Sequence, residues 1–195
     1  MARDMPRQLS LFDEPKTFLP PGFRYAPELM TPAEEQDLIA RLEHLPFKEF
    51  EFHGFVGKRR IVSFGWRYDF SHAKLERIDA MPAFLRPLRA AAARFAGLQA
   101  ASFEHALITE YSPGATIGWH KDRSVFADVI GVSLRSACVF RLRKKIGNVW
   151  QRAAVTLEPR SAYVLQGAAR SEWEHSIPAV DTLRYSVTFR NLRAK

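Results

Sequence analysis

The sequence predicts an α+β fold that is mainly β: a jelly-roll, or double-stranded β-helix, with N-terminal helices packed on one outer face. Two observations predict it. Helical patterns are confined to the first hundred residues, and from residue 103 onward short strand patterns alternate with turns. These strands are expected at 104–111, 116–120, 128–134, 137–143, 152–157, 161–166, 173–177 and 183–191. Eight short strands at this spacing are typical of a jelly-roll rather than of a parallel sheet.

The length of 195 residues and the 47% apolar content suit one domain with a substantial core. We expect residues 1–20 to form a flexible arm and residues 21–195 a single domain, with the jelly-roll core over 103–195. The net charge of +8 favours a polyanionic partner such as nucleic acid. The single cysteine, Cys138, fits a reducing cytoplasm, and no apolar run is long enough to span a membrane. We therefore expect a cytoplasmic monomer without membrane contact.

Two helices are expected before the strands. Thr31-Pro32-Ala33-Glu34 forms a capping box with proline at the first helical position. The helix that follows carries an apolar stripe that we assign to the core: Leu38, Ile39, Leu42 and Leu45. A second helix is expected from about 81 to 95, with Gly97 at its C-terminal end. Pro87 kinks this helix or marks a second start.

Aromatic and cationic residues interleave between residues 50 and 72. From Val62 to Phe70 the even positions are apolar, so one strand is predicted to place Phe64, Trp66, Tyr68 and Phe70 on one face. One interpretation is a sheet that buries these rings. The other is that rings stack on a nucleic-acid base while cations hold phosphate. The candidate substrate contacts are Lys58, Arg59, Arg60, Trp66 and Tyr68.

A candidate metal site begins at His120-Lys121-Asp122, and a third candidate ligand, His175, lies 55 residues further on. Two imidazoles and one carboxylate form the facial triad that holds non-haem Fe(II) and leaves coordination positions open. A His-x-Asp sequence also arises by chance, and it then indicates only a turn with a hydrogen-bonded histidine.

The segment from Arg184 to Arg190 alternates as a strand. One face carries Arg184, Ser186, Thr188 and Arg190, and the other carries Tyr185, Val187 and Phe189. The polar set could be the outer face of a half-buried strand. Alternatively, two converging arginines could bracket a small dicarboxylate, because a planar guanidinium matches the two oxygens of a carboxylate.

Together these segments resemble the AlkB family of Fe(II)/2-oxoglutarate dioxygenases. The matching segments are Leu107–Gly114, His120–Asp122, Val132–Leu134, Trp173–His175 and Arg184–Arg190. The resemblance implies that His120, Asp122 and His175 bind iron. It implies that Arg184, helped by Tyr111, pairs with the distal carboxylate of 2-oxoglutarate, and that Arg190 acts near the metal-chelating end. It also implies cosubstrate contacts from Leu107, Thr109, Ile117 and Ser186, and a nucleotide-recognition lid at 50–72.

The function implied by this resemblance is oxidative dealkylation of N-alkylated bases, with Fe(II), 2-oxoglutarate and O₂. DNA is the preferred substrate and RNA the alternative. Arg123 and Ser124 stand where DNA-repair members often carry a second acidic residue. Two other enzymes on this scaffold therefore stay open, a hydroxylase of modified wobble uridine in transfer RNA and a protein demethylase. A non-catalytic barrel that binds a metal or an acidic ligand is a further alternative.

The N-terminal arm contains a candidate docking motif, Gln8-Leu9-Ser10-Leu11-Phe12. It matches the short peptide pattern by which many bacterial repair and replication proteins bind the sliding clamp. Leu9, Leu11 and Phe12 would anchor in apolar pockets and Gln8 would add a polar contact. The alternative is that the apolar residues hold the arm on this protein's own surface.

Overall fold

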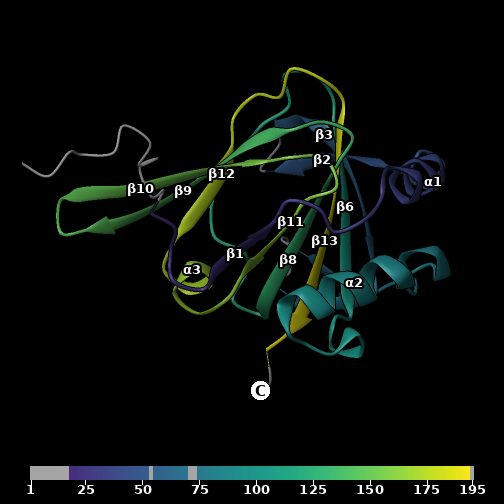
Figure 1. Cartoon of the computed structure of the whole chain (residues 1–195), viewed down its shortest axis with the longest axis horizontal. Helices are drawn as coiled ribbons and strands as arrows, with labels where there is room; N and C mark the ends of the chain where they lie inside the picture. Colours follow the sequence, from purple (N-terminus) through teal and green to yellow (C-terminus); the bar gives the residue numbers. More distant parts are fainter. Residues whose placement is uncertain (1–17, 53–54, 70–73, 194–195) are drawn as a thin grey trace, which may run out of the picture.

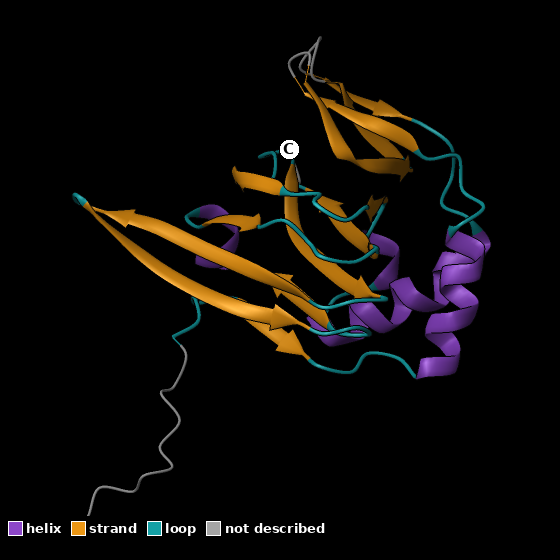
Figure 2. Cartoon of the chain, turned by 90° about the horizontal axis from the view of Figure 1, so that it is seen from above, coloured by secondary structure: helices purple, strands orange, loops and turns teal. Residues whose placement is uncertain are grey.

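The computed structural model describes residues 18–52, 55–69 and 74–193. The proposed clamp motif, with Gln8, Leu9, Leu11 and Phe12, lies outside these residues, as does Phe70. The described chain is mainly β, with antiparallel sheets and its two longer helices on one side, as Figures 1 and 2 show. The predicted jelly-roll architecture is confirmed.

The larger sheet has seven strands in the order β1-β11-β8-β13-β6-β3-β2. Its strands are β1 (Phe23–Ala26), β2 (Lys48–Phe52), β3 (Phe55–Phe64), β6 (His105–Tyr111), β8 (Phe126–Leu134), β11 (Ala162–Leu165) and β13 (Arg184–Leu192). Strand β13 lies between β6 and β8, and its register pairs Arg184 with Tyr111 and Arg190 with His105. The centre of this sheet therefore brings the two arginines beside the strand that carries Tyr111.

The smaller sheet has four strands in the order β10-β9-β12-β7. Its strands are β7 (Ile117–His120), β9 (Cys138–Ile146), β10 (Val149–Leu157) and β12 (Glu174–Ile177). The β9–β10 hairpin projects beyond the rest of the fold (Figures 1 and 2). A separate two-stranded sheet is made by β4 (Trp66–Asp69) and β5 (Lys74–Arg77).

Helices cover the outer face of the larger sheet (Figure 1). They are α1 (Pro32–Leu42) and α2 (Arg86–Ala96). One 3-10 turn, Ala83–Leu85, precedes α2, and another spans Ala100–Ser102. A short helix, α3 (Gly167–Ser171), lies apart from these two helices (Figure 1). The capping box at Thr31 is present, and Leu38 and Leu42 of α1 are buried against the sheet. The alternation along β13 explains the packing, because Tyr185, Val187 and Phe189 lie in this helix-covered core.

Pro87 marks a second helical start rather than a kink. The chain makes the 3-10 turn at Ala83–Leu85 and then begins α2 at Arg86, with Pro87 in its first turn. Proline suits this place because the first turn of a helix leaves backbone N–H groups without intrahelical partners. Gly97 ends α2 with a left-handed φ of 71°, as its position in the sequence predicted.

The single strand predicted from Val62 to Phe70 is wrong, because the chain breaks at Gly65. Gly65 has a φ of +79°, and a Cβ there would lie 1.8 Å from the carbonyl oxygen of Glu104. Only glycine fits this approach. The break separates the aromatic residues: Phe64 is buried in the helix-covered core, whereas Trp66 and Tyr68 lie on β4.

The segment predicted as the lid joins two sheets. Strands β2 and β3 extend the larger sheet through pairing of β3 with β6, and the chain then enters the separate β4–β5 sheet. No helix in the described part of the chain is long and apolar enough to cross a membrane.

Candidate active site

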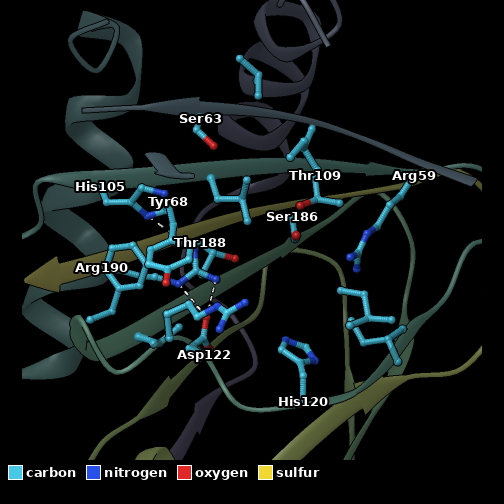
Figure 3. Close-up of a pocket in the computed structure, with 18 of the residues that line it drawn as sticks. Arg59, Ser63, Tyr68, His105, Thr109, His120, Asp122, Ser186, Thr188 and Arg190 are labelled. Atoms are coloured by element: carbon cyan, nitrogen blue, oxygen red, sulfur yellow. Dashed lines mark hydrogen bonds and ion pairs between the residues drawn. The ribbon is translucent and has the colours of Figure 1, made fainter. Parts of the chain in front are cut away.

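A cavity of about 1170 Å³ lies between the two sheets, next to the β4–β5 sheet. Figure 3 shows side chains that line it. Arg184, Ser186, Thr188 and Arg190 line one wall from β13, so the polar face of this strand is an inner surface and not an exposed one. The walls also contain the residues predicted from the sequence to contact cosubstrate and metal: Leu107, Thr109, Tyr111, Ile117, His120, Asp122 and His175.

His120 and His175 are neighbours in the smaller sheet, where β7 and β12 pair them directly. Their ring centroids are 4.2 Å apart. Asp122 follows β7 by two residues, and its Oδ2 lies 3.7 Å from Nε2 of His175. Strand pairing therefore brings together three side chains that are separated by 55 residues of sequence.

Asp122 is almost fully buried, and Arg190 holds it. Nε of Arg190 donates to Oδ1 of Asp122 at 2.8 Å, and Nη2 lies 2.6 Å from the same oxygen. Burial alone would raise the pKa of Asp122, but the charge of Arg190 and the nearby imidazoles hold it well below its usual range. The carboxylate is therefore ionised, and its Oδ2 has no hydrogen-bond partner among the described residues.

These three side chains fit a metal ion. Burial, followed by the charge of His120, lowers the pKa of His175 to about 3, so its imidazole is neutral and can act as a ligand. Nδ1 of His120 lies 2.9 Å from the carbonyl oxygen of Gly118, and a proton on Nδ1 leaves Nε2 for a metal. Within the described ranges, no three His, Cys, Asp or Glu side chains already meet at coordination distance.

Arg184 provides a second binding group in the same cavity. It is 1% exposed, and its Nε and Nη2 donate to Oγ of Ser133 at 3.3 and 3.1 Å. Its guanidinium carbon lies 4.8 Å from the ring centroid of Tyr111, whose hydroxyl is 3.5 Å from Oγ of Ser186. Nη1 of Arg184 has no hydrogen-bond partner among the described residues. A buried guanidinium with a free N–H is suited to an anionic ligand such as a carboxylate.

The five predicted substrate contacts divide between cavity and surface. Arg59 and Tyr68 line the cavity. Arg60 does not, because successive residues of a strand point to opposite faces; it makes a two-point ion pair with Glu110 instead.

Lys58 and Trp66 are also not among the residues that line the cavity. Nε1 of Trp66 donates to Glu104 at 3.3 Å, and the guanidinium of Arg77 lies 6.0 Å from its ring centroid. Base contact by Trp66 stays a prediction, and its ring lies beside Glu104 and Arg77.

His105 is a site residue that the sequence did not reveal. It lies on β6 opposite Arg190 and is buried, with Nδ1 3.5 Å from Nη1 of Arg190. Figure 3 shows Arg190 joined by dashed lines to both Asp122 and His105. Burial and then the charge of Arg190 set the pKa of His105 well below its usual value, so its neutral ring can accept a hydrogen bond. The alternation of His105, Leu107, Thr109 and Tyr111 along one strand face is the signal that could have identified it.

A family model described as the 2OG-Fe(II) oxygenase superfamily matches residues 22–190. A similar curated protein is the "Alkylated DNA repair protein ALKBH8 homolog" of Arabidopsis thaliana, 26% identical over an alignment of 199 residues that covers 89% of this chain and 56% of that protein. An uncharacterized protein of Acanthamoeba polyphaga mimivirus is 30% identical over 99 residues, with 44% of this chain and 47% of that protein covered. The chain thus spans about half the length of the curated relatives it matches.

Two solved structures share the fold. OsALKBH1 superposes with a TM-score of 0.72 at 16% identity, covering 89% of this chain and 98% of that one. A prolyl-4-hydroxylase from Pseudomonas putida superposes with a TM-score of 0.61 at 15% identity, covering 89% and 94%. At these identities the two structures establish the architecture alone.

Proposed function

Because the chain belongs to the 2OG-Fe(II) oxygenase superfamily and is of the AlkB type, we propose that it oxidatively dealkylates N-alkylated bases in nucleic acid. The superfamily implies Fe(II), 2-oxoglutarate and O₂. The observation that carries the proposal is the pairing of two binding groups in one cavity. These are the cluster of His120, Asp122 and His175, and the buried Arg184, whose Nη1 has no hydrogen-bond partner within the described ranges.

In this proposal His120, Asp122 and His175 hold the metal, and the unpartnered Oδ2 of Asp122 is the carboxylate ligand. Arg190 keeps Asp122 ionised and fixes its orientation through two N–H groups on Oδ1. Arg184 binds the distal carboxylate of 2-oxoglutarate with its free N–H, while Ser133 fixes the guanidinium plane.

When bound, iron with 2-oxoglutarate and O₂ supplies the means to hydroxylate a C–H bond, with succinate and CO₂ as coproducts. Hydroxylation of the carbon attached to a ring nitrogen gives a hemiaminal. This product breaks its C–N bond to release an aldehyde and leave the base with an N–H. The chain's own part is to orient the alkyl carbon, hold the cosubstrate and exclude water.

Nucleic acid as substrate is supported by charge and by the shape of the site. The chain carries a net charge of +8, and Arg59 and Tyr68 line the cavity beside the metal cluster. A base inside a duplex cannot enter a cavity between two sheets, so the target base must be unpaired or turned out of the helix. The relative from Arabidopsis thaliana is named as an alkylated DNA repair protein, which agrees with this substrate class.

The test is product analysis by mass spectrometry. The purified chain is incubated with Fe(II), ascorbate and 2-oxoglutarate, and with either methylated DNA or total transfer RNA. We expect loss of methyl groups from DNA bases with release of formaldehyde. Hydroxylated uridine in transfer RNA without loss of methyl groups from DNA would replace dealkylation with the wobble-uridine alternative. That alternative stays in the test because Arg123, and not an acid, follows Asp122 at the cavity.

A further inference from the structure

Arg123 introduces a positive charge at the cavity, directly after the candidate ligand Asp122. Its guanidinium carbon lies 4.9 Å from the ring centroid of Tyr68, and both residues line the cavity. Tyr68 belongs to β4, whereas Arg123 belongs to the loop between β7 and β8. The contact therefore joins the β4–β5 sheet to the loop that carries the candidate ligand Asp122.

The buried side chain of Arg170 holds the loop that carries Arg123. Nη2 of Arg170 donates to the carbonyl oxygens of Arg123 and Phe126, each at 2.7 Å, and Arg170 is only 7% exposed. The backbone N–H of Phe126 also donates to the carbonyl of Arg123 at 3.1 Å. The hydrogen bonds from Arg170 and from the Phe126 N–H to the Arg123 carbonyl both use the backbone of Arg123. The position of its Cα therefore does not depend on its own side chain, and substitutions at Arg123 should leave the loop in place.

Most of the other charged side chains that line the cavity have the same sign as Arg123. Among the described residues that line it, seven are Lys or Arg and three are acidic, Glu49, Asp79 and Asp122. Asp122 is already paired with Arg190. Glu49 and Asp79 are exposed to solvent, as are four of the cations, Lys48, Arg67, Lys121 and Arg123. The charges of Fe(II) and of the 2-oxoglutarate dianion cancel each other, so loading the site leaves this positive excess unchanged.

N-alkylated bases fall into two charge classes. Methylation at N1 of adenine or N3 of cytosine leaves a base that is positively charged at neutral pH. Methylation at N1 of guanine or N3 of thymine replaces a proton and leaves a neutral base. A cationic base at Tyr68 would lie about 5 Å from the guanidinium of Arg123, and like charges at that distance repel at the effective dielectric constant of a protein surface, about 20. A neutral base can stack on a guanidinium plane.

We propose that this cavity selects neutral N-alkylated bases over cationic ones, and that Arg123 sets the preference. The inference rests on the proposed function, because it names the class of base that this same site accepts. A simpler role for Arg123 is a contact to a phosphate of the nucleic-acid backbone. That role would change the affinity for every oligonucleotide by the same factor, whereas base selection changes the ratio between matched bases.

The experiment measures binding of single-stranded oligonucleotides to the full chain, loaded with Fe(II) and 2-oxoglutarate without oxygen. Two matched pairs are used: 1-methylguanine against 1-methyladenine, and 3-methylthymine against 3-methylcytosine. We expect the neutral member of each pair to bind about tenfold more tightly or better. Arg123→Gln should reduce this ratio to about threefold or less, and Arg123→Glu should bring it to unity or reverse it.

The matched control is Arg135→Gln, which removes the same charge from an exposed residue that pairs with Glu43 and does not line the cavity. The ratio should stay as in the unaltered chain. Equal affinities within both pairs, tighter binding of the cationic bases, no binding of any of the four, or an Arg123→Gln effect that is uniform across them would each overturn the proposal. Admitting oxygen to the same samples then tests dealkylation separately from base selection by Arg123. A binding preference without dealkylation contradicts only the proposed function, and dealkylation without a binding preference contradicts only the role of Arg123.

Discussion

Replacing Arg184 with glutamine tests whether this buried guanidinium binds a carboxylate of 2-oxoglutarate. Arg184 is 1% exposed, its Nη1 has no partner among the described residues, and Ser133 fixes its other side. Truncating one member of a buried, hydrogen-bonded charge pair costs about 2–5 kcal/mol. Glutamine can still donate one hydrogen bond, so we expect the lower part of that range. A loss of about 2–3 kcal/mol raises the dissociation constant about 30-fold to 140-fold.

The assay is calorimetric titration of 2-oxoglutarate into protein that carries Mn(II) in place of Fe(II), without oxygen. Ser133→Ala is the graded variant, since it leaves the guanidinium and removes its side-chain partner. Losing that hydrogen bond costs about 1 kcal/mol, or about fivefold in affinity. Arg135→Gln, which removes an exposed charge outside the cavity, serves as the control and should bind as the unaltered chain does.

The reasoning fails if Arg184→Gln folds cooperatively and binds 2-oxoglutarate with unchanged affinity. Arg184 would then be a structural cation held by Ser133 and Tyr111, and the carboxylate would require another partner. Arg59 would be the next candidate, because it lines the same cavity and pairs in register with Tyr111.

Three further predictions concern stability, the lid and the arm. Hydrogen bonds from Arg60 lower the pKa of Glu110. The resulting stability is present above the unfolded-state pKa of about 4.3 and is lost as pH falls through the lower folded value. Glu110→Gln should cost about 1–2 kcal/mol at pH 7 and flatten the acid limb of a denaturation series; the cost is modest because Arg60 is half exposed, although Glu110 is buried. Trp66→Ala should leave oligonucleotide binding within about twofold in a fluorescence titration, because the ring does not line the cavity; a loss of tenfold or more, in roughly the range of one stacked base, would return Trp66 to the substrate site. A fluorescent peptide of residues 6–15 should bind a bacterial sliding clamp with roughly micromolar affinity and lose it with Phe12→Ala; absence of binding at high clamp concentration would end that proposal.

Periodicity predicted which side chains share a strand face, because it is a property of the strand itself, but it left open whether the polar face is exposed or lines a cavity. The two-residue alternation from Arg184 to Arg190 placed the arginines on one face, and the structure turns that face into the cavity. The residue spacing of His120, Asp122 and His175 predicted the site only through the family resemblance. Their proximity comes from the pairing of β7 with β12, which no local pattern specifies.

Tertiary contacts explain the errors. The strand predicted through Trp66 ends at Gly65, because the carbonyl of Glu104, 39 residues further along the chain, approaches its backbone closely. His105 carried no ligand spacing, and it becomes part of the site only because β6 pairs it with Arg190. Arg60 resembled its neighbour Arg59 in the sequence, yet the strand directs it to Glu110 and away from the cavity.

The central claim is that His120, Asp122 and His175 hold the iron of a nucleic-acid dealkylase. The most direct measurement follows succinate and formaldehyde together, with methylated oligonucleotides, Fe(II), ascorbate and 2-oxoglutarate. We expect methylated substrate to stimulate succinate release with matching formaldehyde, and His120→Ala, Asp122→Ala and His175→Ala each to abolish both while the protein stays folded. Full activity in any of the three variants, or no stimulation by any methylated oligonucleotide, would contradict the claim.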